Sequence, residues 1–132
     1  MALGLRYLTV LAVLALGDFL WLSWFAPAMF RPTLGAVLLD SPRWSGAVLF
    51  YLLYTAGVLI FPLGLARDTA TALIYGALFG FVAYMTYDAT NFATLKPWTA
   101  QLALIDTGWG AGLTAVASLA GFLVAQRMSP HL

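Results

Sequence analysis

The sequence predicts an all-α membrane protein, an antiparallel four-helix transmembrane bundle. Of its 132 residues, 63% are hydrophobic and only 8% are charged. A soluble domain carries about 25% charged residues, so this chain could not cover a water-exposed surface with polar groups. The charged positions leave four apolar segments, each close to the roughly 20 residues that a helix needs to cross a bilayer. Leu and Ala dominate these segments and strand alternation is absent, which excludes a barrel of short strands.

Residues 1–132 are interpreted as a single integral membrane domain. Its four spans are expected at residues 6–29, 44–66, 69–93 and 99–126. The first span begins like a cleavable signal peptide, with Arg6 ahead of an apolar run and small residues at Ala15 and Gly17. The apolar character continues through Leu22, so we interpret this segment as a retained span.

Short connections make consecutive helices antiparallel neighbours. Loops are expected at residues 31–43, 67–68 and 94–98, where prolines and charges interrupt the apolar pattern. Four spans place both termini and the 67–68 loop on one side of the membrane, here called side A. The other two loops lie on side B. Lys and Arg are divided evenly between the sides, with Arg6, Arg67 and Arg127 on side A and Arg31, Arg43 and Lys96 on side B. The α-amino group adds a charge to side A, which therefore favours a cytoplasmic position for both termini.

Composition excludes several function classes. The net charge is +1 and there is no basic stripe, so a nucleic-acid partner is not expected. Cysteine is absent and the one histidine, His131, lies one residue from the C-terminus. Thiol catalysis, Fe–S clusters and His- or Cys-ligated metals within the bilayer are thereby excluded, and the sequence predicts no cofactor and no metal site.

Three aspartates fall inside the predicted spans at a common depth. Counting a rise of about 1.5 Å per residue, Asp18, Asp88 and Asp106 all lie in the side B half. An Asp facing lipid at the centre of a helix costs roughly 2.5 to 3.5 kcal/mol. We therefore expect the three to face inward, where they are the candidate catalytic residues.

Polar and aromatic side chains reach the same depth. Tyr84, Asp88 and Asn91 follow the i, i+4, i+7 spacing of one helix face, and Asp106 with Trp109 repeats the pattern. The candidate ligand-binding residues are Tyr51, Tyr54, Tyr84, Tyr87, Thr90, Asn91, Lys96, Trp21 and Trp109. The alternative is that the acids are structural, hydrogen-bonded groups that hold helices together. Lys96 either folds back over the site or extends to the membrane interface.

Small residues predict where helices approach closely. Gly76 and Gly80 form a GxxxG motif, and Gly108, Gly110 and Gly112 recur on the fourth span. We expect the tightest contact between the third and fourth spans. Another group of residues, Trp21, Trp24, Trp44 and Trp98, lies near the side B boundary, where aromatic belts form.

Four strings give a resemblance to a known family: GDFLWL at 17–22, FYLLYTAG at 50–57, YDATNFATLKPW at 87–98 and DTGWG at 106–110. The chain resembles a bacterial family of four-span inner-membrane proteins classed as a domain of unknown function. The resemblance implies a four-helix fold in the bacterial inner membrane, and it implies no activity. It also marks a set of positions: Asp18, Tyr51, Tyr54, Tyr87, Asp88, Thr90, Asn91, Thr94, Lys96, Trp98, Asp106 and Trp109.

Two functions from different classes follow. The first is an intramembrane pocket, open to side B, that binds a small lipid-soluble or cationic amphiphile and could transform it by acid–base chemistry. The alternative is an accessory or assembly subunit that packs against a larger membrane complex or a second copy. A subunit should present a ridge of small residues outward, whereas a lone bundle keeps such a ridge inside. The sequence leaves open whether the protein is an enzyme.

Overall fold

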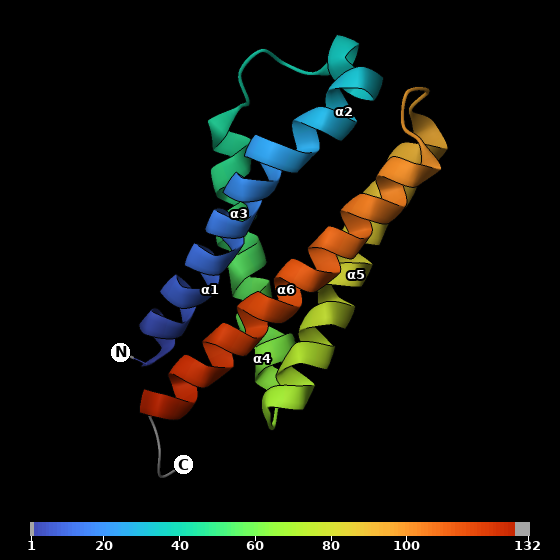
Figure 1. Cartoon of the computed structure of the whole chain (residues 1–132). Coiled ribbons are helices and arrows are strands. Elements are labelled where there is room, and N and C mark those ends of the chain that lie inside the picture. Colours follow the sequence, from blue (N-terminus) through green and yellow to red (C-terminus); the bar gives the residue numbers. More distant parts are fainter. Residues whose placement is uncertain (1, 129–132) are drawn as a thin grey trace.

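The computed structural model describes residues 2–128, which form four helical crossings (Figure 1). The first crossing contains α1 (Ala2–Leu20), a π-helical turn η1 (Trp21–Phe25), α2 (Ala26–Leu34) and a 3-10 turn η2 (Gly35–Val37). The others contain α3 (Trp44–Ile60) with α4 (Pro62–Leu65), then α5 (Thr69–Thr94), then α6 (Ala100–Met128). Each crossing is long and apolar enough to span a membrane. The predicted four-helix fold is confirmed, and His131 lies outside the described residues.

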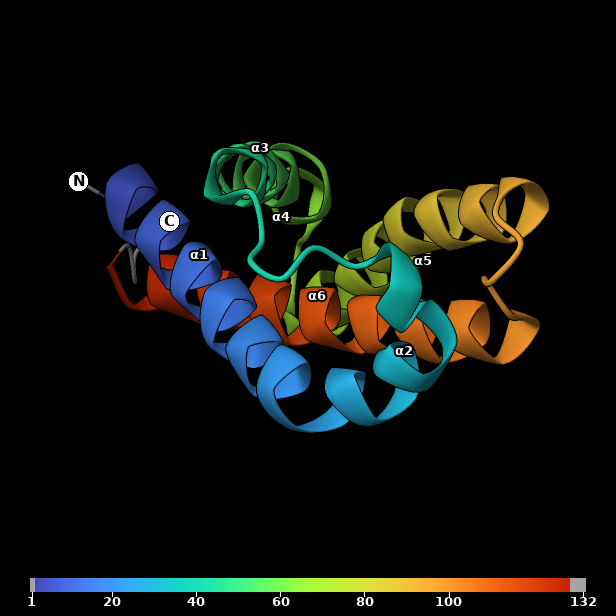
Figure 2. The same cartoon turned by 90° about the horizontal axis from the view of Figure 1, so that it is seen from above.

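The first crossing is longer than predicted. Arg31 and Pro32, expected in a loop, lie within α2, so that boundary was wrong. The π-helical turn was not predicted either. The N–H of Ala26 bonds to the carbonyl of Trp21, five residues back, and the next residue, Pro27, has no N–H to donate. The chain changes direction between α1 and α2 at this point (Figure 2).

The ends of the later helices follow from local chemistry. Asp68 caps α5: its carboxylate accepts from the N–H of Thr71 at 2.7 Å, and Thr71 Oγ1 accepts from the N–H of Asp68 at 3.0 Å. The backbone hydrogen bond from Thr71 lowers the pKa of the Asp68 carboxyl. Thr99 Oγ1 accepts from the N–H of Leu102 at the start of α6. Pro62, which lacks an N–H, separates α4 from α3.

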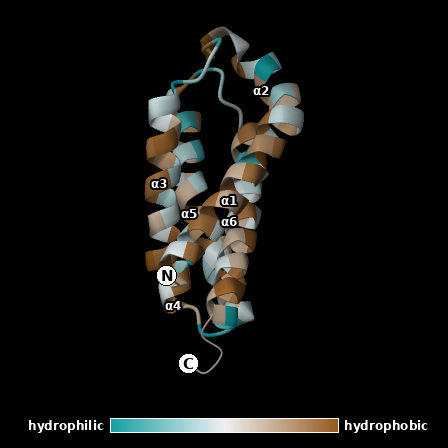
Figure 3. Ribbon diagram, turned by 90° about the vertical axis from the view of Figure 1, so that its left-hand side faces the viewer, coloured by the Kyte–Doolittle hydropathy of each residue, from teal (hydrophilic) through white to brown (hydrophobic). Residues whose placement is uncertain are grey.

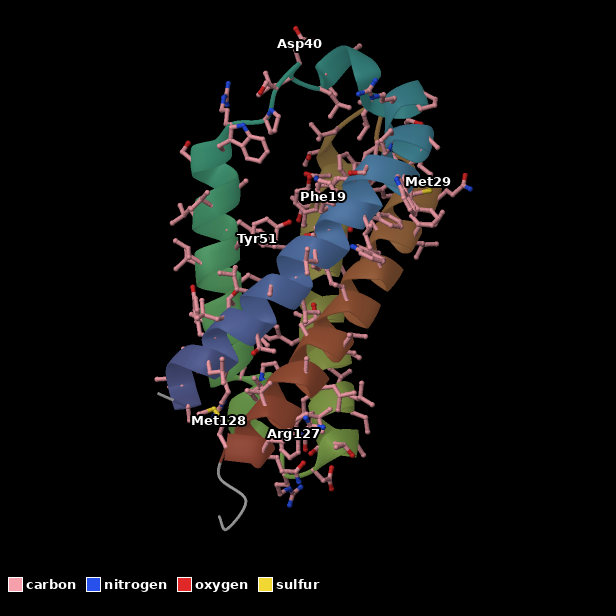
Figure 4. All side chains as sticks on the ribbon, turned by 60° about the vertical axis from the view of Figure 1, so that its left-hand side comes forward. Phe19, Met29, Asp40, Tyr51, Arg127 and Met128 are labelled. Atoms are coloured by element: carbon pink, nitrogen blue, oxygen red, sulfur yellow. The ribbon has the colours of Figure 1, made fainter. Side chains whose placement is uncertain are left out.

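Helix α6 is the centre of the bundle. α5 packs along it more extensively than any other pair of helices, and α1 forms its second contact. α3 contacts mainly α1 and lies apart from α5 in the view down the bundle (Figure 2). The start of α1, the α4–α5 connection and the end of α6 share one end of the bundle, as expected for side A (Figure 1). Arg127 and Asp40 mark opposite ends in Figure 4.

Glycine allows the close contact between α5 and α6. A Cβ atom on Gly80 would lie 2.5 Å from the carbonyl oxygen of Gly110, and one on Gly76 would lie 2.8 Å from the carbonyl oxygen of Thr114. Both distances are shorter than van der Waals contact, so these positions require glycine. A Cβ on Gly110 would overlap the ring of Tyr84. The predicted close approach of the third and fourth spans is confirmed.

Two other glycines do not take part in this contact. Nothing lies within 4 Å of a Cβ placed on Gly108 or Gly112, and both residues are exposed. The expectation that they pack against a neighbouring helix was wrong. At about 100° per residue, Gly108 and Gly112 lie on the face of α6 opposite to Gly110.

The apolar core lies mainly toward side A. It includes Val10 and Leu14 from α1, Val58 from α3, and Leu113 and Ala117 from α6. Much of the outer surface is also hydrophobic along the helices (Figure 3), as expected where lipid rather than water is the solvent. The core therefore closes one half of the bundle, and the site described next occupies the other half.

Candidate functional site

A cavity of about 650 Å³ lies in the side B half, with walls from all four crossings. Its lining is almost entirely apolar or aromatic, with two carboxyl groups. The lining residues are Asp18, Trp21, Leu22, Phe30, Leu34, Leu38, Phe50, Ala83, Tyr84, Tyr87, Trp98, Asp106 and Trp109.

Asp18 joins three helices at the cavity wall. It is buried near the end of α1, and both of its oxygens accept hydrogen bonds. Tyr51 of α3 donates its hydroxyl to Oδ2 at 2.5 Å, and Trp109 of α6 donates its indole N–H to Oδ1 at 3.0 Å. Figure 4 shows Tyr51 extending from α3 toward α1. A carboxyl group that accepts at both oxygens has the hydrogen bonding of an ionised carboxylate.

Asp88 and Asp106 form a second group, with Asp106 at the cavity wall and Asp88 behind it. Asp88 of α5 is 0% exposed, and its Oδ2 accepts from Thr107 Oγ1 at 3.2 Å. Its Oδ1 is buried without a hydrogen-bond partner. The carboxyl group of Asp106, which lines the cavity, lies next to that of Asp88. Trp98 Nε1 is also close to Asp88 and is likewise buried without a partner.

Aromatic rings form much of the remaining wall. Trp21 and Trp109 stack nearly parallel, with centroids 4.7 Å apart and an interplanar angle of 9°. Tyr87 meets Trp98 edge to face at 5.6 Å. Tyr54 packs behind the lining residues Phe50 and Tyr84, and its hydroxyl shares a hydrogen bond with Thr114 at 2.7 Å. Stacked and edge-to-face rings therefore make up much of the cavity lining.

Most of the residues proposed from sequence are brought together. Six of them line the cavity: Asp18, Asp106, Trp21, Tyr84, Tyr87 and Trp109. Tyr51 and Asp88 each contact a lining carboxyl group, and the Tyr54 ring packs against Phe50 and Tyr84.

The remaining three proposed residues also lie outside the lining. Thr90 is exposed and donates its hydroxyl to the carbonyl of Thr86 on its own helix. Lys96 is exposed in the connection between α5 and α6. The Asn91 side chain lies beside Tyr87 but does not line the cavity.

The sequence did not identify several residues of the site. Trp98 was assigned to the interfacial belt, although its place in the YDATNFATLKPW string was a signal for a role beside Asp88. Thr107 of α6 was missed because nothing in the sequence shows that it faces Asp88 of the neighbouring helix α5. Phe30 and Leu34 were missed because their segment was expected to end the first span. Leu38 was missed because it was expected in a loop.

The described chain offers little to bind a metal. Within residues 2–128, no group of three or more His, Cys, Asp or Glu is placed to hold an ion. The chemistry that the site offers is instead that of carboxyl groups, tyrosine hydroxyls and indole N–H groups in an apolar cavity.

Comparison with known proteins identifies a family. The family model described as "Predicted membrane protein (DUF2177)" matches residues 3–123. No curated protein and no solved structure matches the chain. The family match agrees with the four apolar crossings, and the resemblance found from the sequence is confirmed. The chain belongs to the DUF2177 family of predicted membrane proteins.

Proposed function

We propose that this protein binds a small amphiphilic cation in the side B cavity. The observation that carries the proposal is a cavity of about 650 Å³ whose aromatic and apolar wall contains two carboxyl groups, Asp18 and Asp106. Small-molecule sites typically measure about 300 to 1,000 Å³ and combine an apolar lining with a few polar groups. The volume and lining of this cavity fit that description.

The polar groups favour a cation. Asp18 is already supplied with two donors and has the hydrogen bonding of an ionised carboxylate, so it offers negative charge inside the bundle. Aromatic faces also attract cations, most strongly where water is excluded. None of the lining residues is basic. The carboxyl groups would therefore repel an anionic ligand, and no basic side chain of the lining would pair with it.

The rim of the cavity favours a lipid-soluble ligand. Among the lining residues, Phe50 is 43% exposed, Tyr87 is 57% exposed and Leu38 is 47% exposed. These apolar and aromatic residues come from α3, α5 and the segment after η2. Their exposed apolar surface would give an amphiphile already dissolved in the bilayer an apolar route to the carboxyl groups.

Binding is tested with tetraphenylphosphonium, a lipophilic cation, on the full chain in lipid nanodiscs. Equilibrium dialysis should show saturable binding above that of empty nanodiscs, and no saturable binding of tetraphenylborate, the anion of matched shape. Asp18→Asn should weaken binding about tenfold, because a charge-assisted contact contributes about 1.5 kcal/mol or more. Asp40→Asn, in an exposed loop, is the matched control. Equal binding of both ions, or none of the cation, would overturn the proposal.

A reaction on the ligand would use Asp106. This carboxyl lines the cavity and lies beside a second carboxyl, which is an arrangement that suits proton transfer to or from a bound molecule. The same tetraphenylphosphonium experiment tests binding alone, since this probe has no proton to exchange.

A second candidate function is that of an accessory subunit, and the outer glycines favour it. Gly108 and Gly112 are exposed, four residues apart, and face open space on α6. Small residues at this spacing allow a transmembrane helix of a larger complex to approach closely. After extraction in a mild detergent, the 14.2 kDa chain should then migrate in a larger complex on a native gel, and Gly108→Leu should release it. A parent chain that migrates alone would contradict this function.

We also propose that the protein lies in the bacterial inner membrane with side A in the cytoplasm. The absence of cysteine makes single-cysteine labelling direct. Asp40→Cys, at side B, should react with a membrane-impermeant maleimide in intact spheroplasts. Asp68→Cys, at side A, should react only after permeabilisation. The reverse pattern would invert the orientation.

A further inference from the structure

We infer that Asp88 and Asp106 hold a single proton between them and that this proton leaves when a cation occupies the cavity. The first half of the inference concerns the carboxyl pair alone. The second half rests on the proposed function, because it needs a cation to bind beside Asp106.

The geometry of Asp88 is the starting point. The residue is 0% exposed, yet only Oδ2 has a partner, the hydroxyl of Thr107 at 3.2 Å. Oδ1 is buried and accepts no hydrogen bond. A buried carboxylate oxygen without a donor is costly. A proton placed between this residue and the adjacent carboxyl of Asp106 supplies the missing hydrogen bond.

Electrostatics lead to the same result. Two ionised carboxyl groups in contact repel each other strongly in an apolar interior, and such a pair retains one proton. No basic side chain lines the adjoining cavity to offset a second negative charge. The titratable groups that face Asp106 from the other helices are Asp18 of α1 and Tyr84, Tyr87 and Asp88 of α5.

Asp18 and the carboxyl pair therefore have different roles. Asp18 receives hydrogen bonds at both oxygens, from Tyr51 and Trp109, which hold its carboxyl group in one position. The pair accepts one hydrogen bond, from Thr107, while Trp98 Nε1 lies close to Asp88 without bonding to it. Asp106 lies at the cavity wall and Asp88 lies behind it. A cation that binds against Asp106 therefore also changes the electrostatic potential at the buried Asp88.

The exchange balances in charge and in atoms. Before binding, the pair carries one proton and one negative charge. When the cation lies against Asp106, its positive charge compensates a second carboxylate, and the O–H bond of the pair breaks. The proton passes to water on side B, the end of the bundle nearest Asp88. One positive charge enters the site and one leaves, so the net charge of the cavity does not change.

The first experiment needs no ligand. Infrared difference spectra of the full chain in nanodiscs, recorded while the pH is raised, should show loss of the C=O stretching band of a protonated carboxyl. Asp88→Asn and Asp106→Asn should each remove that band, and Asp40→Asn should keep it. Circular dichroism confirms that the variants remain helical. A parent without the band, or a band that survives in both variants, would overturn the shared proton.

The second experiment measures the exchange. In a weakly buffered solution, at a pH where the infrared band is present, tetraphenylphosphonium should release one proton for each cation bound. Its dissociation constant should rise about tenfold for each unit that the pH is lowered, as linkage requires. In Asp88→Asn both effects should disappear. Cation binding without proton release would overturn the exchange. An intact band with no cation binding would overturn the proposed function and the exchange while leaving the shared proton in place.

Discussion

The two halves of this bundle are built from the same helices but are packed in opposite ways. Toward side A, α1, α3 and α6 meet through Val10, Leu14, Val58 and Ala117, all of which are fully or nearly fully buried. Toward side B, α1 and α3 are joined across a cavity by a single tyrosine–aspartate hydrogen bond. The comparison teaches that close packing in one half allows the other half to keep a cavity with buried charge.

The membrane explains why the close packing matters. Lipid chains are as apolar as leucine, so the hydrophobic effect does not drive helices together within the bilayer. Helices are held instead by van der Waals contact, which requires small residues and matching surfaces. Gly76 and Gly80 provide that contact between α5 and α6. Carboxyl groups and tyrosines then add hydrogen bonds in the half where the helices are farther apart.

The largest effect is expected from a cavity in the packed half. Leu14→Ala should lower the free energy of unfolding by about 3 kcal/mol, because the residue is 1% exposed and its neighbours cannot close the space. Leu16→Ala is the matched control, since Leu16 is 65% exposed. Unfolding in mixed micelles, followed by circular dichroism, measures both. Equal effects at the two positions would mean that the side A core does not support the fold.

A somewhat smaller loss is expected from overpacking the contact between α5 and α6. Gly80→Leu should destabilise the protein by about 2 kcal/mol, since the new Cβ would meet the carbonyl oxygen of Gly110 at 2.5 Å. Gly108→Leu, on the open face of α6, should unfold like the parent. The same unfolding assay applies, and a parent-like Gly80→Leu would show that this helix contact tolerates a side chain.

Two tyrosine hydroxyls join α1 and α3, and they allow a direct comparison of a part-buried and an exposed hydrogen bond. Tyr51→Phe should cost about 1 to 2 kcal/mol, because it leaves Asp18 Oδ2 without its donor. Tyr7→Phe should cost less, because Tyr7 donates to the backbone carbonyl of Leu52 at an exposed position. Unfolding of the two variants in parallel checks the order. A larger loss for Tyr7→Phe would show that the exposed hydrogen bond joins α1 and α3 more strongly than the part-buried one.

The smallest effect is expected at the exposed cap of α5. Asp68→Ala should lower the melting temperature slightly, and Asp68→Asn, which retains a capping oxygen, should lower it less. Because folding lowers the pKa of this carboxyl, its contribution is complete above the unfolded pKa and disappears as the pH falls through the folded pKa. The difference between parent and Asp68→Ala should therefore vanish in acid. A difference that persists there would contradict this account of the cap.

The sequence was sufficient to predict that there are four spans, although not where the first one ends, and to group the carboxyl groups at one level. Charges interrupt the apolar segments near the observed helix ends, and the rise per residue places Asp18 and Asp106 at one level. Which way a side chain faces was harder to predict. Gly108 and Gly110 look equivalent in the sequence, but only Gly110 meets α5, because tertiary packing and not local sequence fixes the rotation of α6.

The part of the cavity wall that α2 forms could not be predicted for a related reason. Phe30 and Leu34 belong to a helix that continues past the expected end of the first span. Proline usually interrupts a helix, so Pro32 led to a loop in place of the observed helical turn. The pairing of Asp88 with Thr107 depends on how α5 and α6 are aligned. The spacing of residues along either helix does not predict that alignment.

The π-helical turn between α1 and α2 determines how far α2 is rotated about the helix axis relative to α1. Each residue of a regular helix advances by about 100°, so deleting one residue between Trp21 and Phe25 would turn α2 by roughly that angle relative to α1. Asp18 would keep its place, while Phe30 and Leu34 would rotate away from the cavity that they now line. The length of this five-residue turn therefore determines which side chains of α2 line the cavity, and with them its shape. Family members that differ by one residue here should share the carboxyl groups and accept ligands of different outline.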